Sequence, residues 1–455
     1  MFKKLIKGLV AGGAALTIAA SAASAADTIE VNIFGASAQY KFWTAAAPEY
    51  LKSICNRPAL DVYAATNETE AELNKADPDY HDRDSGIAVC AGVNAFAGVT
   101  GQGYTGDGDT LIIRYTTNSS YDGPMSVLND DTFDADNCPT DGDRLQASPK
   151  VGELALFPLV GNSIDDLTCM DVHVGASDVS VKTFQQTSDG FSAGPLGSAS
   201  SIINRTISYP STVQDPADVV GFQVDNPIVV PFGFFANNDA ATPVPVDNLS
   251  RLMAINLFSG QYANWNELDP TYPDMPVTVC HRAAGSGTVA TLNAAVFRGD
   301  KALPTRQQDG TFGSPYFNPG VQFGFAPAIY FNKGSSDATR CAGNVIGAVS
   351  YADSDKCVNG CGDKFGKVKA IAYQGVGGDL NADTMSDAMK YGRHIFWAAQ
   401  YLYSNQTGEV DAQIDGLVAF ASQDANMPPA REDFWAAQGA MNWEKATDFA
   451  WPTKK

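Results

Sequence analysis

The sequence has little histidine, few basic residues and no long run of apolar residues. Its 455 residues contain 4 His, and 30 Lys and Arg stand against 51 Asp and Glu, which gives a net charge of -21. The sequence therefore offers few ligands for a metal centre built from several histidines. So acidic a chain also lacks the broad basic face with which proteins follow nucleic-acid backbones. We expect no metal, no cofactor and no nucleic-acid partner.

Residues 1–25 form a separate unit. Lysines at positions 3, 4 and 7 precede an uncharged run over residues 8–20, and small residues at 23–25 suit a signal peptidase. This pattern is typical of an export signal that is removed, so we expect a periplasmic or secreted protein. No later stretch offers the roughly 20 uninterrupted apolar residues of a membrane span.

An even number of cysteines in an exported chain predicts disulfides. The eight cysteines allow many pairings, and the sequence does not choose among them. A redox or zinc role for the Cys-x3-Cys motif near residue 360 lacks a second ligand pair. Our hypothesis is that neighbours pair: Cys55 with Cys90, Cys138 with Cys169, Cys280 with Cys341, and Cys357 with Cys361.

Short strand patterns alternate with helical patterns, which is typical of an α/β fold. Helical spacing predicts a helix over 40–51, with a bend or restart at Pro48. Much of 67–149 is rich in Gly and Asp, and we interpret it as surface insertions around one strand. Its acidic clusters contain no complete calcium loop. The other expected helices are 249–257, 289–296, 384–403 and 412–422, and the expected strands are 28–34, 110–115, 170–175, 227–236, 277–281 and 345–351.

Three turns share one design, in which a strand runs into small and hydroxyl residues. In at least two of them a helix then begins, and the unpaired N–H groups of a helix start attract anions. The turn at 282–288 is the strongest, because Arg282 could clamp two oxygens of a tetrahedral oxyanion. Ser286, Gly287 and Thr288 would offer amide and hydroxyl donors around it.

Asp178 follows another of these turns. An ionised carboxylate only accepts hydrogen bonds, so beside a bound anion it is favourable only if that anion carries a proton. Hydrogen phosphate carries one near neutral pH and sulfate does not. Asp178 would therefore select phosphate against sulfate by repulsion.

Five motifs occur in an order that resembles the periplasmic phosphate-binding proteins of ABC importers, over residues 28 to about 375. The resemblance implies an α/β fold of the type 2 periplasmic binding protein class, with two lobes and a hinge between them. It implies a binder of inorganic phosphate or a similar oxyanion that serves a membrane ABC permease and is not an enzyme. We further expect a monomer. The motifs are Gly35-Ala36-Ser37-Ala38, Gly175-Ala176-Ser177-Asp178, Asn264-Trp265, Arg282-Ala283-Ala284-Gly285-Ser286-Gly287-Thr288 and Ile346-Gly347-Ala348-Val349-Ser350-Tyr351.

The resemblance also implies a division of the chain and a set of ligand contacts. Residues 26–229 would form lobe 1, 230–355 lobe 2, and 356–455 a return to lobe 1 with C-terminal helices. Asp178 would accept the proton of the ligand. The other implied contacts are Arg282, Ser286, Gly287 and Thr288 from lobe 2, and Ala38, Gln39, Tyr40 and either Ser119 or Ser120 from lobe 1.

The chain departs from the family in three places that bear on the ligand. The family usually has a glycine-rich Ser-Ser-Gly-Gly where this chain has Ser119-Ser120-Tyr121-Asp122-Gly123. Gln39-Tyr40 stands where the family usually has Thr-Phe, and Ala284 stands where it commonly has an acidic residue. Arsenate, another oxyanion or an anionic organic ligand therefore stay open behind phosphate.

Each site residue also has a plainer interpretation. Ser286, Thr288 and Asp178 could cap helices or turns, and Arg282 could form a surface ion pair. An extracellular phosphatase or other hydrolase using His281 and Ser286 is an alternative, although no nucleophile elbow is present. An adhesin or matrix protein on the same scaffold is another. The aromatic residues of the tail are expected to cover a core rather than dock a partner: Trp397, Tyr401, Tyr403, Trp435, Trp443 and Trp451.

Overall fold

The computed structural model describes residues 28–55, 61–65, 85–91, 109–130, 138–148, 166–184, 219, 221–282, 285–298, 328–332, 334–357, 365–377, 384–405 and 410–455. The predicted export signal lies outside them. No helix among these residues is both long and apolar enough to cross a membrane.

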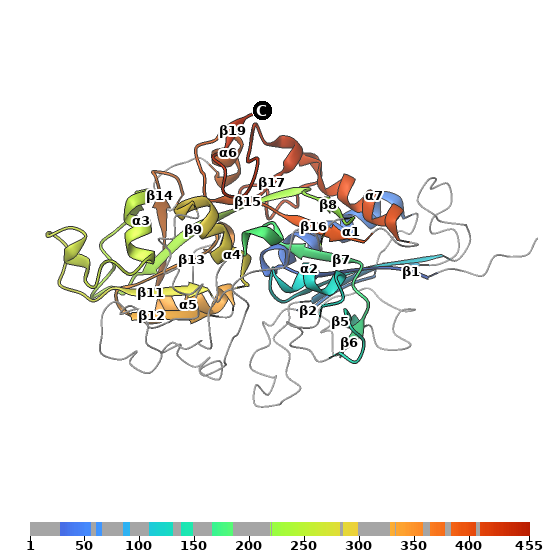
Figure 1. Ribbon diagram of the computed structural model, residues 1–455, viewed down its shortest axis with the longest axis horizontal. Coiled ribbons are helices and arrows are strands. Elements are labelled where there is room, and N and C mark those ends of the chain that lie inside the picture. Colours follow the sequence, from blue (N-terminus) through green and yellow to red (C-terminus); the bar gives the residue numbers. More distant parts are fainter. Residues whose placement is uncertain are drawn as a thin grey trace, which may run out of the picture.

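Lobe 1 is built on a seven-stranded sheet with the strand order β2-β3-β4-β1-β7-β16-β8 (Figure 1). Strand β1 pairs in parallel with β4 and with β7. The carboxyl ends of these three strands therefore lie at one edge, where α/β sheets bind ligands. The strands are β1 (Thr28–Gly35), β2 (Asp61–Ala65), β3 (Ser85–Cys90), β4 (Thr110–Thr117), β7 (Val174–Ser177), β8 (Gln223–Asp225) and β16 (Tyr401–Ser404), with a separate pair β5 (Arg144–Ser148) and β6 (Asp166–Met170).

The helices of lobe 1 begin where these strands end. η1 (Ser37–Gln39) and α1 (Tyr40–Ile54) follow β1, α2 (Asp122–Val127) follows β4, and η3 (Val181–Thr183) follows β7. α1 continues through Pro48, so the helix does not restart there. Glycines bring α2 very close to β7: a Cβ at Gly175 would lie 2.2 Å from the Gly123 oxygen. This close approach fixes the turn before α2 beside the end of β7.

Lobe 2 is built on an eight-stranded sheet with the order β10-β14-β9-β13-β11-β12, in which β15 and β17 also pair with β9. β11 is parallel to β12 and to β13. Their last residues, Arg282, Asn332 and Asp353, therefore share one edge of the sheet. The strands are β9 (Ile228–Asn237), β10 (Asn248–Leu249), β11 (Thr278–Arg282), β12 (Ala328–Asn332), β13 (Ala348–Asp353), β14 (Val368–Tyr373), β15 (Trp397–Ala399) and β17 (Ala436–Ala437).

The remaining helices cover lobe 2 and the tail. α4 (Gly287–Thr291) passes directly into the π-helix η7 (Leu292–Phe297), and α5 (Ser335–Asn344) follows β12. α7 (Asp411–Ala421) returns to α1, where the Tyr50 and Phe420 rings lie 5.6 Å apart. The others are α3 (Arg251–Phe258), η6 (Trp265–Glu267), η9 (Ser354–Cys357), α6 (Met385–Lys390), η11 (Asp424–Asn426), η12 (Gln438–Ala440) and the hairpin β18 (Trp443–Glu444) and β19 (Thr453–Lys454).

Two strand connections join the lobes. The chain passes from β8 into β9 and returns from β15 into β16. The Gln400 amide N–H donates to the Ile228 oxygen at 2.9 Å, and the Asn226 side chain donates to the Gln400 oxygen at 3.1 Å. The predicted α/β fold with two lobes is thus confirmed, and the two crossings lie side by side.

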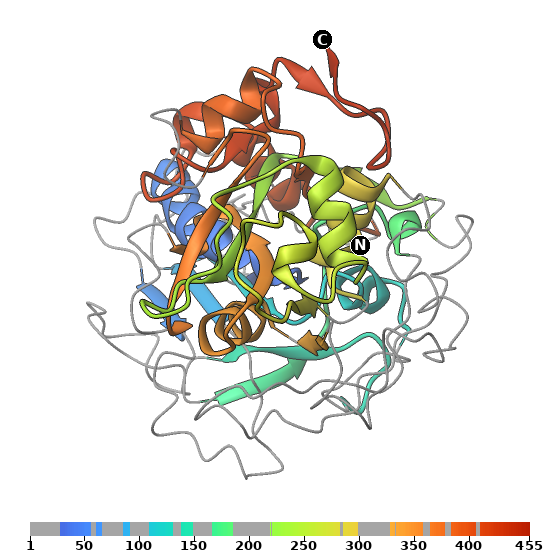
Figure 2. The same cartoon turned by 90° about the vertical axis from the view of Figure 1, so that its left-hand side faces the viewer.

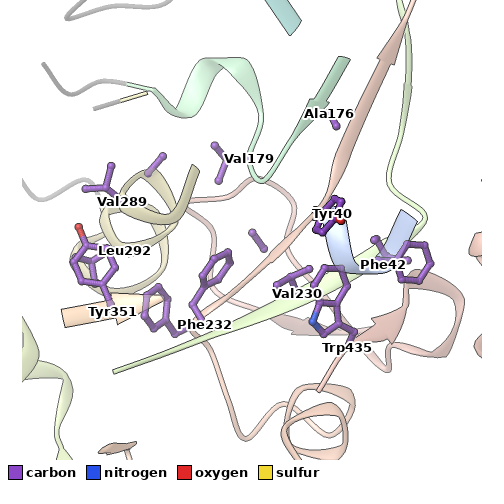
Figure 3. Packing of buried hydrophobic residues seen from close by; sticks show 14 of the residues in the cluster. Tyr40, Phe42, Ala176, Val179, Val230, Phe232, Val289, Leu292, Tyr351 and Trp435 are labelled. Atoms are coloured by element: carbon purple, nitrogen blue, oxygen red, sulfur yellow. The ribbon is translucent and has the colours of Figure 1, made fainter. Parts of the chain in front are cut away.

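One hydrophobic cluster extends through both lobes, from Val31 and Trp43 to Phe234 and Val279. Figure 3 shows Val179, just after β7, on the side of the cluster where Val289 of α4 lies. The Phe42 and Trp435 rings stack at 5.8 Å, which joins α1 to the tail. Among the tail aromatics, Trp397 and Trp435 are buried as predicted, whereas Trp451 is 55% exposed.

The prediction of a helix over 384–403 was wrong. Only α6 forms there, and residues 397–404 form β15 and β16 instead. Gly392 has a φ of +72° and lies against the Trp443 ring, so the chain turns out of the helix at a position suited to glycine. The apolar spacing that resembled one helix face belongs to two strands, one in each sheet.

Other boundaries also moved. The interpretation of 67–149 as surface insertions around one strand was too broad, because buried β3 and α2 fall within it. The strand expected over 170–175 is two strands, β6 and β7, and the strand expected over 345–351 is β13, which begins three residues later. The exact lobe boundaries stay a prediction.

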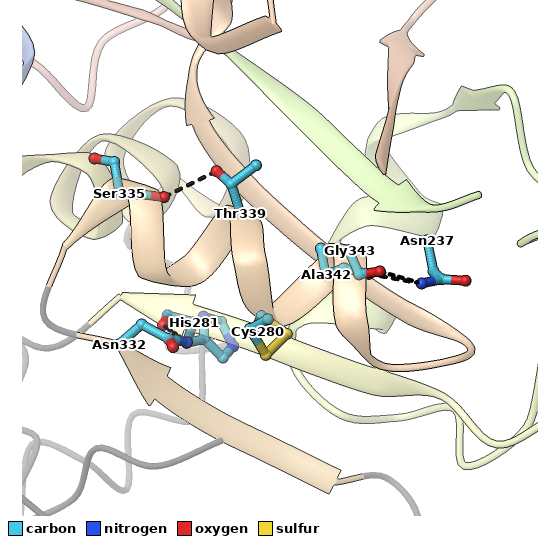
Figure 4. Close-up of a disulfide and its surroundings, with 9 residues drawn as sticks. Asn237, Cys280, His281, Asn332, Ser335, Thr339, Ala342 and Gly343 are labelled. Atoms are coloured by element: carbon cyan, nitrogen blue, oxygen red, sulfur yellow. Dashed lines mark hydrogen bonds between the residues drawn. A yellow bond between two sulfur atoms is a disulfide. The ribbon is translucent and has the colours of Figure 1, made fainter. Parts of the chain in front are cut away.

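Three of the four hypothetical disulfides are present: Cys55–Cys90, Cys138–Cys169 and Cys280–Cys341. The Cys357–Cys361 pairing lies outside the described residues. Figure 4 shows the third bond linking β11, next to His281, to α5. The bond therefore ties β11, which ends at Arg282, to α5, which begins at Ser335. Both residues belong to the candidate site described next.

Candidate anion-binding site

The candidate site lies where the carboxyl ends of parallel strands from both sheets meet. Asp178 follows β7, Arg282 ends β11, and Ser286 directly precedes α4. Their exposed fractions are 2%, 3% and 4%, respectively. The structure thus buries together three polar residues that are far apart in the sequence.

The lobe 1 half of the site is a hydroxyl paired with a carboxylate. Ser120 Oγ donates to Asp178 Oδ2 at 3.0 Å. The other carboxylate oxygen, Oδ1, is buried and has no hydrogen-bond partner among the described residues. An unpaired buried acceptor is costly, so an oxygen in this state is suited to a donor that arrives with a ligand.

Burial also changes the acidity of this carboxyl group. It raises the pKa of Asp178 to about 7, while the Ser120 hydrogen bond and Arg282 oppose the shift and Asp353 adds to it. The same group can therefore accept a proton at pH values near neutrality. Asp353, the last residue of β13, was not among the predicted site residues.

The lobe 2 half is built around the Arg282 guanidinium. Its Nη1 donates to Thr288 Oγ1 at 3.3 Å and to the Ser335 hydroxyl, and the Arg282 backbone N–H donates to the Tyr351 hydroxyl at 3.1 Å. Arginine stays charged in proteins. Burial lowers the pKa of Arg282, and four neighbouring groups oppose this shift: Tyr351, Asp178, Asp337 and Asp353.

Ser335 is a residue of the candidate site that the sequence reasoning missed. It opens α5 just after β12, preceded by Gly334, and so repeats the design of a strand running into small and hydroxyl residues. That local pattern could have identified it. Its contact with Arg282, however, depends on the pairing of β11 with β12, which the sequence does not display.

The two halves touch directly. A Cβ on Gly287 would lie 2.4 Å from both Asp178 Cβ and Ser120 Oγ, so only glycine permits this approach. The Tyr121 amide N–H of lobe 1 donates to the Gly285 oxygen of lobe 2 at 3.1 Å. The lobes are therefore closed on each other at this point.

Ser286 lies in the same contact. Its Oγ is buried and has no hydrogen-bond partner among the described residues, and it makes no side-chain cap on α4. Ser286 thus occupies the N-cap position of α4, as one interpretation had it, but its side chain makes no capping hydrogen bond. The hydroxyl is available to a ligand, together with Asp178 Oδ1.

Other predicted contacts from lobe 1 are engaged within that lobe. The Gln39 side chain donates to the Ser177 oxygen at 3.0 Å and accepts from Trp43 Nε1 at 2.8 Å. Ser119 Oγ accepts from the Asp122 N–H at 3.2 Å.

The Tyr40 hydroxyl is also turned inward, toward the Ser85 oxygen at 3.4 Å. Ala38 is buried in η1 beside Gln39. The predicted roles of Ala38, Gln39 and Tyr40 in ligand binding stay predictions, and of the two serines Ser120 is the one placed beside Asp178.

His281 does not form a catalytic pair with Ser286 in this structure. Its Nδ1 is 2.9 Å from the Tyr351 hydroxyl and its Nε2 is 2.8 Å from the Phe258 oxygen. Burial lowers the pKa of His281 to about 4, so the ring is neutral at physiological pH. With both nitrogens engaged, it has no lone pair left to activate a serine.

Metal ligands are also not gathered here. Among the described residues, no group of three or more His, Cys, Asp or Glu side chains could hold an ion. The site thus combines the positive charge of Arg282, the titratable carboxyl group of Asp178 with the Asp353 carboxyl group near it, and several hydroxyls.

No family model matches the sequence. The fold is similar to that of several solved phosphate-binding proteins. One, from Clostridium perfringens, is a putative phosphate ABC transporter substrate-binding protein with bound phosphate. It shares 11% identity over 90% of this chain and 99% of its own, with a TM-score of 0.41.

Two further structures are of the same kind. PstS from Borrelia burgdorferi has 8% identity over 90% of this chain and 98% of its own, with a TM-score of 0.38. The phosphate-binding protein from Stenotrophomonas maltophilia has 15% identity over 68% and 77%, with a TM-score of 0.38. These are proteins of the class that the sequence motifs resemble, and at such identities they do not show what this chain binds.

Proposed function

We propose that this protein binds a small tetrahedral oxyanion between its two lobes, with hydrogen phosphate as the preferred ligand. The observation that carries the proposal is the buried Asp178 carboxyl group, whose Oδ1 has no partner among the described residues although it lies in the contact between the lobes. Arg282 would supply the charge that attracts an anion, and Ser286 and Ser120 would supply hydroxyls.

The preference for phosphate follows from the acceptor character of Asp178. An ionised carboxylate and hydrogen phosphate can share the proton of the ligand, whereas sulfate brings no proton near neutral pH. Sulfate would place two like charges side by side, which costs binding free energy. His281, the base of the hydrolase alternative, has its two ring nitrogens engaged by Tyr351 and Phe258, so it gives that alternative no support.

The proposal extends to the setting of the protein. The export-like N-terminal sequence and the disulfides support a location outside the cytoplasm. There the protein would capture its ligand and deliver it to a membrane ABC permease. Closure of the lobes over the ligand would present the surface that the permease recognises.

Calorimetric titration of protein stripped of bound anion tests the proposal. Binding of phosphate should give a measurable heat and a dissociation constant that is micromolar or lower. Sulfate should bind far more weakly at pH 8. Asp178→Asn should narrow that difference, because an amide can donate to sulfate. Asp171→Asn, at an exposed carboxylate in the turn before β7, is the matched control.

Absence of phosphate binding in the stripped protein would reject the proposal. Turnover of p-nitrophenyl phosphate that Ser286→Ala abolishes would instead favour a hydrolase. If the wild type bound phosphate and sulfate with equal affinity, the site would still bind anions, but Asp178 would not have the selective role assigned to it.

A further inference from the structure

The C-terminal segment Lys445–Trp451, here called the strap, contacts the lobe connection and both lobes within seven residues. It follows β18 and lies between the two strands of the terminal hairpin. Figure 1 shows the end of the chain above the junction of the lobes, and Figure 2 shows the same segment at the top of the molecule. The strap makes none of the contacts described for the candidate site, so its role follows from what its own contacts hold together.

The first anchor of the strap is at the lobe connection. Lys445 Nζ donates to the Ile395 oxygen at 3.1 Å and to the Trp397 oxygen. It also lies 4.1 Å from the centroid of the Trp397 ring. Trp397 begins β15, which pairs with the crossing strand β9, so this end of the strap is fixed to the part common to both lobes.

The second anchor is in lobe 1. Asp448 Oδ2 accepts from the Ser180 N–H at 2.8 Å and from Thr183 Oγ1 at 2.6 Å, and Oδ1 accepts from the Tyr401 hydroxyl at 3.2 Å. Asp448 is 7% exposed. Ser180 is two residues beyond Asp178, so this anchor holds the turn that carries the lobe 1 half of the candidate site.

The third anchor is in lobe 2. Arg298 Nη1 donates to the Phe449 oxygen at 3.2 Å and to the Ala450 oxygen at 2.6 Å, and its guanidinium lies 3.8 Å from the centroid of the Trp451 ring. The Arg251 guanidinium is 5.5 Å from the same ring. Arg298 directly follows η7, the continuation of the helix that starts at Gly287.

The spacing of these anchors restricts movement. Asp448 is held by lobe 1 and the next residue, Phe449, by lobe 2, and consecutive Cα atoms are only about 3.8 Å apart. The lobes cannot separate along this edge unless one of the two sets of contacts breaks. The lobe 2 set is the more accessible one, because Trp451 is 55% exposed whereas Asp448 is buried.

We propose that the strap is a releasable tether that holds the two lobes closed, and that detaching Phe449–Trp451 from Arg298 lets the candidate site open. The consequence for ligand exchange rests on the proposed function: a tether that favours the closed form slows both entry and release of the anion. The tether itself is a property of the lobes and is present without a ligand.

The test measures lobe separation in the anion-free protein. Spin labels on non-natural residues at positions 52 and 367, which are exposed and lie in lobes 1 and 2, avoid the disulfides. Trp451→Ala and Asp448→Asn should each broaden the distance distribution toward longer values. Lys454→Ala, at an exposed position of the same tail, should leave it unchanged, and circular dichroism verifies that each variant is folded.

Phosphate release measured by stopped flow should be at least fivefold faster in both strap variants than in the wild type or Lys454→Ala. Identical distance distributions in the wild type and both strap variants would overturn the tether. A protein that binds no phosphate would refute the proposed function, and the distances measured without ligand would still decide on the tether.

Discussion

The two lobes bring different chemistry to the same contact. Lobe 2 supplies a guanidinium, Arg282, whose charge is fixed because arginine stays protonated. Lobe 1 supplies the Asp178 carboxyl group, which burial brings to a pKa of about 7, so its charge changes near neutral pH. In the proposed function, attraction of an anion and selection among anions would therefore reside in different lobes, and substitutions can separate the two.

The largest effect is expected from removing the fixed charge. Arg282→Ala should weaken phosphate binding by at least about 100-fold, since two charge-assisted hydrogen bonds of about 1.5 to 3 kcal/mol each would be lost. Calorimetry at pH 8 measures this loss. Lys367→Ala removes an exposed charge from the same lobe and should have little effect; a similar loss in both variants would mean that only net charge matters.

A smaller effect with a distinct pH dependence is expected from lobe 1. At pH values below its pKa of about 7, Asp178 is protonated and can donate a hydrogen bond to sulfate. At higher pH, the ionised carboxylate repels sulfate. The protonated fraction falls about tenfold from pH 6 to pH 8, so sulfate affinity should fall about tenfold over the same interval. Calorimetric titration with sulfate at both pH values measures this change.

Asp178→Asn should remove the pH dependence, because the amide does not titrate in this range. Arg282→Lys provides the contrasting variant: it keeps a positive charge in lobe 2 but changes the geometry of the donors, and should keep the pH dependence of sulfate affinity. A wild-type sulfate affinity that is the same at pH 6 and pH 8 would contradict the assignment of Asp178.

Features that are local in the sequence were the predictable ones. The turns that carry Asp178 and Arg282 were identified because strand, small residues and hydroxyls follow one another directly along the chain. The α/β class followed from the same alternation. Three disulfides agreed with pairing between neighbours in the sequence.

Features that depend on pairing between distant segments were missed. Ser335 and Asp353 reach the site only because β12 and β13 pair with β11. The false helix over 384–403 failed at Gly392, whose positive φ ends α6, and beyond it β15 pairs with the distant strand β9. Apolar spacing alone does not distinguish a helix face from a strand that crosses between lobes.

Ser335 offers the smallest and most specific test of the lobe 2 half. Its hydroxyl accepts from Arg282 Nη1 and so orients the guanidinium. Ser335→Ala should weaken phosphate binding about threefold, because the guanidinium keeps its charge and its contact with Thr288 and loses only part of its orientation. Ser336→Ala, at the next position of α5 and partly exposed, is the matched control.

A double-mutant cycle distinguishes orientation of Arg282 from general support of α5. If Ser335 acts through the guanidinium, Ser335→Ala should change phosphate affinity in the wild type and have no further effect when Arg282 is already alanine. An equal loss in both backgrounds would show that the hydroxyl supports the fold of lobe 2 instead. Because the cycle subtracts any common effect on stability, its outcome reports whether phosphate binding requires a fixed orientation of the Arg282 guanidinium in addition to its charge.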